Sequence, residues 1–169
     1  MAIKRYFSNA DNTITNAFQE NLLTRGTGSN MGANDILETF SILGQVSSSS
    51  GLTAELSRVL IKFPVTDVIT DRAAGSIPAS GSVSFFLHLY NAEHISTTPK
   101  DFKLTVSAIS ASWQEGEGMD MESYGDKTYG IRGSNWIQSS ASTSWSSQGG
   151  DYHSSPTSTI SMETVREHI

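Results

Sequence analysis

The composition of this chain narrows the classes of protein to which it can belong. It has 169 residues, a net charge of −6 and no cysteine, and a chain of roughly 100–200 residues fits one domain. The missing cysteines exclude disulfides and thiolate metal sites, and no Lys/Arg cluster is present to bind a phosphate backbone. Residues 1–6 lack the apolar stretch of a secretory signal, and no apolar run approaches the roughly 20 residues of a membrane span. We therefore expect neither a nucleic-acid nor a membrane partner.

The first quarter of the chain predicts strands separated by a polar loop. Residues 1–9 form a short apolar lead-in, and alternation predicts a strand over residues 13–18. Several Gly and Asn residues predict a loop over residues 26–34. A second strand is predicted over residues 35–46, where a helix is the competing interpretation and β-branched and aromatic residues favour the strand. A flexible turn at residues 47–51 follows.

The middle of the chain carries one strand and one helical turn. Residues 56–65 predict a strand that Pro64 ends, because proline lacks the N–H that a ladder needs. A helical turn is expected over residues 66–74, with Asp67 as its cap. Residues 77–81 contain Ile77-Pro78 and a glycine, and predict a turn.

The second half begins with two apolar strands and ends with one more. Residues 82–92 and 103–113 predict strands, and residues 93–101 connect them. The strand signal then fades until residues 157–165, which alternate again. Several strands with Gly, Pro and Ser turns favour an all-β fold, an antiparallel jelly-roll-like β-sandwich with long loops and little helix. Residues 10–169 would form this single domain.

All three tryptophans fall between residues 113 and 145: Trp113 closes the strand predicted over residues 103–113, and the other two lie in the irregular stretch that follows it. Trp113 and Trp136 are expected to anchor the loop in the core, because a buried tryptophan removes a large apolar area from water. Trp145 lies between two serines, which favours partial exposure. Trp145 and Tyr152 are therefore the candidate residues for stacking on a sugar ring.

The order of several motifs resembles the DNRLRE-type domain, a jelly-roll β-sandwich related to carbohydrate-binding modules. The motifs, in chain order, are Asn30-Met31-Gly32-Ala33, Ser57–Phe63, Ile77-Pro78, Val83–Tyr90, Trp113-Gln114-Glu115-Gly116 and Asn135-Trp136-Ile137. The literal signature peptide is absent, and Glu55–Leu60 stands in its place. The resemblance covers about residues 11–165.

The chain departs from that family pattern at its end, where only residues 157–169 follow the Gly149-Gly150-Asp151 loop. A sandwich without its closing strand would leave an unprotected edge. We therefore expect either that the domain is incomplete at its C-terminal end, as part of a longer protein, or that a neighbouring subunit completes the edge by strand addition.

Acidic residues in the loop suggest two further kinds of chemistry. Their carboxylates could hold Ca²⁺, with Asp120 and Asp126 as the candidate ligands, although capping of turns is the commoner role of such residues. Pairs such as Glu115 and Asp120, or Glu117 and Asp126, could hydrolyse a glycosidic bond, but a loop fixes no distance between them. No zinc-binding His pattern and no Gly-x-Ser-x-Gly motif is present, so the expectation is a protein that is not an enzyme and needs no cofactor.

Two functions from different classes follow. The stretch from Gly116 to Glu122 after Trp113 is similar to proteins encoded by bacteriophages. This resemblance implies a non-enzymatic virion structural protein of the head, neck or tail/fibre, made in the host cytoplasm, with copies of itself and other virion proteins as partners. The lead-in would then be a docking arm with Ile3, Tyr6 and Phe7 as anchors. The alternative is a carbohydrate-binding module that recognises host-surface polysaccharide.

Overall fold

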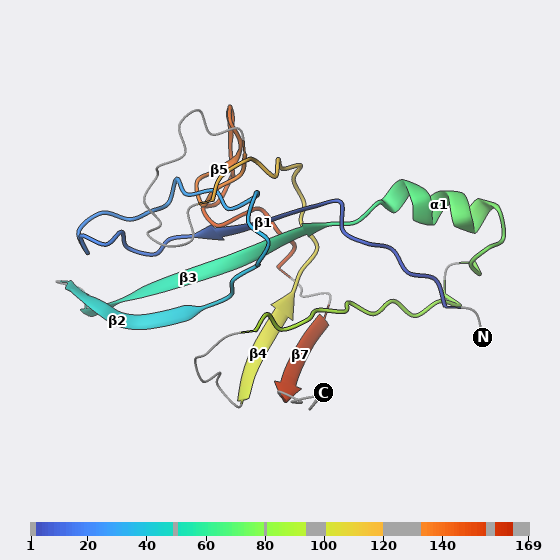
Figure 1. Ribbon diagram of the computed structural model, residues 1–169, viewed down its shortest axis with the longest axis horizontal. Coiled ribbons are helices and arrows are strands. Elements are labelled where there is room, and N and C mark those ends of the chain that lie inside the picture. Colours follow the sequence, from blue (N-terminus) through green and yellow to red (C-terminus); the bar gives the residue numbers. More distant parts are fainter. Residues whose placement is uncertain are drawn as a thin grey trace.

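The centre of the protein is one long strand in a three-stranded antiparallel sheet. The structure is a computed structural model that describes residues 3–48, 51–79, 81–93, 101–119, 133–154 and 158–163. Strand β3 (Gly51–Lys62) lies between β1 (Ala10–Thr15) and β2 (Ser41–Ser48), as Figure 1 shows. The register pairs Asn12 with Leu60 and Ile14 with Arg58.

The remaining elements are short and lie around this sheet. Strand β4 (Asp101–Val106) pairs with β7 (Ser158–Glu163), and β5 (Gln138–Ser140) pairs with β6 (Thr143–Ser144). Helix α1 (Val65–Ala73) follows β3 and extends beyond its end (Figure 1). The part of the chain that the structure describes is therefore β-rich with little helix, as the sequence predicts, but its sheets are small. No helix within it is long and apolar enough to cross a bilayer.

Strand β1 is buried on both faces, which explains why four successive residues, 12–15, are inaccessible to solvent. Asn12 and Ile14 share one face with Arg58 and Leu60 of β3, because directly paired residues point to the same side of a sheet. On the opposite face, the hydroxyl of Thr13 accepts a hydrogen bond from the N–H of Glu38 at 3.1 Å. Layers of chain thus cover both sides of β1.

The segment before β2 is irregular, so the strand predicted over residues 35–46 begins later than expected, at Ser41. The hydroxyl of Ser57 on β3 accepts from the N–H of Phe40 at 2.8 Å and donates to the carbonyl of Glu38 at 2.9 Å. The Ser57 side chain therefore takes the place of backbone groups that would form these hydrogen bonds in a regular pair of strands.

Helix α1 confirms the helical turn expected over residues 66–74, but the expected cap is wrong. The N-cap position is Pro64, and no side chain caps it. Asp67 lies within the first turn, where a carboxylate interacts favourably with the helix dipole without capping it.

Two predicted strands differ most from the structure. Residues 83–93 are extended but belong to no strand, and β4 ends at Val106 instead of continuing to residue 113. Beyond β4, a single bridge joins Ile109 to Tyr152. Alternation predicts an extended backbone, whereas a strand also requires a partner at hydrogen-bonding distance.

The apolar core lies between the β1–β3 sheet and the segment from Trp113 to Tyr152, called here the tryptophan loop. Its buried members are Ile14, Leu60, Trp136 and Trp145, and Trp113 is partly buried against them. The core role expected of Trp136 is therefore confirmed. The protein also buries polar side chains, among them Asn12, Asn30, Ser134 and Asn135. Hydrogen bonds as well as apolar packing therefore hold the interior together.

Candidate functional site

Asn30 joins the tryptophan loop to the Gly/Asn loop through four hydrogen bonds. Its Nδ2 donates to the carbonyls of Glu115 at 2.6 Å and Ser134 at 2.7 Å. Its Oδ1 accepts from the N–H groups of Gly118 at 2.8 Å and Gly32 at 3.2 Å. The side chain is completely buried. A single amide thus connects three segments that are far apart in the sequence.

Glycines around Asn30 allow the chains to approach this closely. A Cβ at Gly118 would lie 2.0 Å from the carbonyl oxygen of Asn30, and one at Gly133 would lie 2.5 Å from the Cα of Gly116. Gly116 itself has φ of +91°, a conformation that residues with a Cβ rarely adopt. The Gly-x-Gly sequence after Trp113 is therefore a packing requirement.

Asn12 on β1 adds three hydrogen bonds to the network around Asn30, and this network is called here the polar joint. Its Nδ2 donates to the carbonyl and the hydroxyl of Ser134 at 2.8 and 2.9 Å, and its Oδ1 accepts from the N–H of Met31 at 2.9 Å. No local sequence pattern marks Asn12, and Asn30 stands out only as part of the Asn30–Ala33 motif. The glycines that flank Asn30 in the sequence were the available signal.

Trp145 is buried, so the expectation that its ring is exposed is wrong. Only 5% of the residue is accessible, and its indole N–H donates to the carbonyl of Asn135 at 2.8 Å. Burying the ring while pairing its one donor is favourable for tryptophan. Trp145 cannot provide a face for a sugar, and it fastens the loop to the core.

Tyr152 is half-exposed and borders an open pocket of about 610 Å³. Arg58 lies between two aromatic rings, with its guanidinium carbon 5.0 Å from the ring centroids of both Tyr152 and Trp136. Its Nη1 also donates to the carbonyl of Gly149 at 2.5 Å. Among the described residues, Arg58 forms no ion pair, and its guanidinium instead stacks on two rings and binds a backbone carbonyl. Four serines, Ser110, Ser146, Ser147 and Ser154, are among the residues that line the same pocket.

The carboxylate of Asp151 at this pocket is occupied in closing a turn. Its two oxygens accept from the N–H groups of Ser146 and Ser147, each at 2.9 Å. These hydrogen bonds hold the pKa of Asp151 below its ordinary value. The turn-capping role expected for acidic loop residues is confirmed here.

Glu115 is likewise engaged, since its Oε1 accepts from the N–H of Asp11 at 2.8 Å. Burial and the nearby charge of Glu115 raise the pKa of Asp11. The calcium candidates Asp120 and Asp126 lie outside the described residues. The structure therefore tests neither the expected calcium site nor the carboxylate pairs that include these two residues. Within the described ranges, no three His, Asp or Glu side chains gather as metal ligands.

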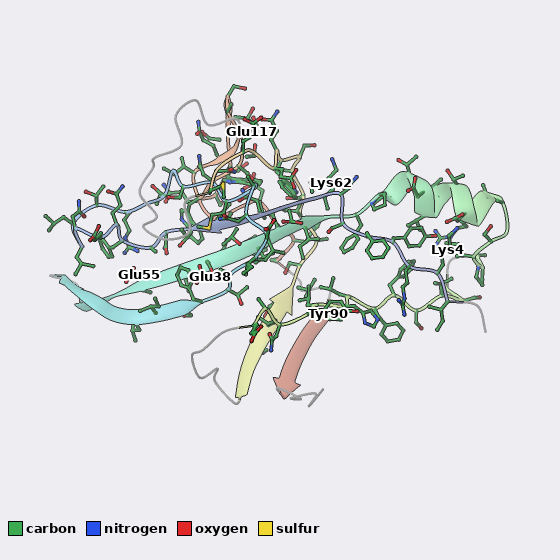
Figure 2. The ribbon with its side chains drawn as sticks, in the orientation of Figure 1. Lys4, Glu38, Glu55, Lys62, Tyr90 and Glu117 are labelled. Carbon is green, nitrogen blue, oxygen red and sulfur yellow. The ribbon has the colours of Figure 1, made fainter. Side chains whose placement is uncertain are left out.

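The N-terminal arm, residues 3–9, is tied to α1 through one carboxylate. The phenol of Tyr6 donates to Oδ2 of Asp71 at 2.6 Å, and Lys4 forms an ion pair with the same oxygen. The bond to Asp71 raises the pKa of Tyr6 to about 12, and the bonds from Lys4 and Tyr6 lower the pKa of Asp71. Figure 2 shows Lys4 on this arm near α1. Ile3 and Phe7 are exposed, whereas the third expected anchor, Tyr6, is partly engaged within the chain.

We expect Asp71→Asn to release the N-terminal arm, because it removes the charge that holds both Lys4 and Tyr6. Trypsin should then cut after Lys4 and Arg5 several-fold faster than in the wild type. Because the pKa of Asp71 is depressed in the bound arm, the contact is fully present above the ordinary carboxyl pKa and is lost as pH falls through the lower, bound value. The phenol of Tyr6 adds an upper limit, and the contact weakens as pH rises through about 12.

Asp67→Asn is the matched control, since Asp67 is an exposed carboxylate one turn earlier on α1. It should leave cleavage after Lys4 and Arg5 unchanged. Equal cleavage rates in the Asp71 variant and the wild type would show that the ion pair does not restrain the arm.

Among the described residues, several exposed apolar side chains lie together on the segment 83–93, called here the extended segment. Phe85, Phe86 and Tyr90 are 66%, 79% and 92% exposed, and Leu87 and Leu89 are also accessible. Figure 1 shows this segment as a long trace between α1 and β4, away from the β1–β3–β2 sheet, and Figure 2 labels Tyr90 on it. Apolar side chains of this size are seldom left together in water unless another surface covers them.

Comparisons with protein-family models, with curated proteins and with solved structures gave no significant match. The resemblance to the DNRLRE-type domain therefore rests on the sequence motifs alone.

Proposed function

We propose that this chain is a non-enzymatic structural subunit that works through contacts with copies of itself and with other proteins of a bacteriophage virion. In this proposal the small sheets belong to a jelly-roll-like sandwich of the DNRLRE type. The observation that carries the proposal is the extended segment, which presents five large apolar side chains to solvent. An exposed apolar surface of this kind is typical of a protein–protein contact.

The loop chemistry supports an assembly role over catalysis. Four of the loop side chains singled out by the sequence are engaged in holding the loop: Asp151 and Glu115 accept backbone hydrogen bonds, and Trp136 and Trp145 are buried. A rigid loop layer fastened to a sheet is a suitable scaffold for contacts that need complementary area and no reactive group.

Mass spectrometry of purified phage particles tests this proposal. Particles released from the host of the encoding phage should contain the chain in a fixed ratio to the other virion proteins, and the ratio should survive density-gradient purification. Absence of the chain from otherwise complete particles would overturn the virion assignment.

A second function, recognition of a host-surface polysaccharide, is favoured by the pocket beside Tyr152. An aromatic ring next to several hydroxyl groups is a suitable environment for a sugar, because the ring packs against C–H groups while the hydroxyls exchange hydrogen bonds. Tyr152→Ala should abolish binding on a glycan array, whereas Tyr152→Phe should retain most of it. If the Ala variant binds as the wild type does, or if the wild type binds no glycan, this function fails.

A further inference from the structure

The extended segment runs as a long trace (Figure 1) and has no strand partner among the described residues. Residues 83–93 make no backbone hydrogen bond to any other described residue. Their side chains follow the alternation of a strand, with Phe85, Leu87 and Leu89 on one side and Phe86 and Tyr90 on the other. A row of free N–H and C=O groups along an apolar segment is a template for pairing with another strand.

The segment also lacks the features by which proteins prevent such pairing. Exposed edge strands usually carry a charged side chain, a proline or a bulge. Between Ser82 and Ala92 there is no Lys, Arg, Asp, Glu, Pro or Gly. The sequence is therefore typical of a strand that pairs with another strand.

We propose that two copies of this chain pair antiparallel through the extended segment, around a twofold axis at Leu87. This inference rests on the proposed assembly function and names its partner and geometry. Leu87 is the midpoint of the run from Ser82 to Ala92, which contains no charged residue, Pro or Gly, so this register pairs the most residues of that run. It places Phe85 opposite Leu89 of the second copy on one face, and Phe86 opposite His88 on the other.

Symmetry favours a second copy over an unrelated strand, and the charges of the contact region do not oppose it. Each chain carries a net charge of −6, but two copies can meet here without bringing like charges together, because residues 82–92 include no Lys, Arg, Asp or Glu. An antiparallel pair about a twofold axis covers the same segment on both chains at once and closes the assembly.

The exposed area is large enough for this contact. With ~200 Å² for a whole aromatic side chain, the exposed parts of Phe85, Phe86 and Tyr90 amount to roughly 450 Å². A standard interface buries about 800 Å² on each partner. The leucines and the newly paired backbone can supply most of the remainder.

The cysteine-free chain allows a direct test with single introduced cysteines. In Leu87→Cys, the two copies place their Cα atoms about 4.5–5.5 Å apart across the axis, within the range of a disulfide. Mild oxidation should therefore yield a covalent dimer. Val83→Cys alone should not crosslink, because the two Val83 positions lie roughly 27 Å apart at ~3.4 Å per residue. A mixture of Val83→Cys and Asn91→Cys chains should crosslink, because these positions face each other.

Two further variants separate pairing from folding. Ser142→Cys, at an exposed turn between β5 and β6, should crosslink no more than background. Leu87→Glu places two carboxylates on the axis, and we expect it to weaken dimerisation at least 100-fold in sedimentation equilibrium while circular dichroism stays unchanged.

The outcomes distinguish this inference from the proposed function. An oligomer that crosslinks at neither Leu87 nor the Val83–Asn91 pair overturns strand pairing and leaves the virion role intact. A chain that stays monomeric throughout sedimentation also overturns strand pairing, while particle composition still decides the virion role. A dimer with the expected crosslinks that is missing from particles retains the pairing and rejects the virion role.

Discussion

Asn30→Ala should destabilise the protein by about 3–5 kcal/mol. Asn30 is completely buried and makes four hydrogen bonds, and its removal leaves the N–H of Gly118 and the carbonyl of Glu115 without their partner. Each buried group left unsatisfied costs about 1–3 kcal/mol, and a cavity adds to this. Urea denaturation followed by fluorescence measures the change, because the three tryptophans lie in or beside the loop that Asn30 holds.

Two variants make this prediction specific. Asn30→Asp preserves the volume but replaces the donor with an oxygen that faces the carbonyls of Glu115 and Ser134, so it should also destabilise the protein. Asn9→Ala, at an exposed position, should change stability by less than about 0.5 kcal/mol. If Asn30→Ala unfolds at the same urea concentration as the wild type, the polar joint does not hold the loop.

Trp136→Ala should cost about 3–5 kcal/mol, the usual range for removing a large aromatic side chain from a core. Trp136 packs with Ile14 and Leu60 and lies against Arg58. Its loss also removes a ring on which that guanidinium stacks. We therefore expect the Arg58–Tyr152 pocket to lose its shape together with the stability, measured as a lower urea midpoint and as faster proteolysis of residues 146–152.

Phe7→Ala is the matched control for Trp136→Ala, since it removes an aromatic ring that is exposed on the N-terminal arm. Its effect on the urea midpoint should lie within experimental error. If Trp136→Ala unfolds at the same urea concentration as Phe7→Ala and the wild type, Trp136 does not belong to the cooperative core.

The candidate sites could be predicted from the sequence only in part. The sequence pointed to Tyr152 as an aromatic residue at the end of the irregular stretch and to an apolar lead-in, but the joint around Asn30 was missed. Asn30 and Glu115 are separated by 85 positions, and no local pattern reports a hydrogen bond across that distance. Trp145 was misjudged because its serine neighbours suggest exposure, whereas the carbonyl of Asn135 accepts its indole N–H and allows it to be buried.

Local chemistry determined which parts of this chain are extended, turned or helical. The β-rich class, the loop over residues 26–34, the helix near residues 66–74 and the extended state of residues 83–93 all follow from side-chain alternation and from Gly and Pro, which act within a few residues. Tertiary structure decided which extended segments pair. The backbone groups of a strand bond to residues distant in sequence, so β3 has two neighbours, while the extended segment, with a stronger apolar pattern, has none among the described residues.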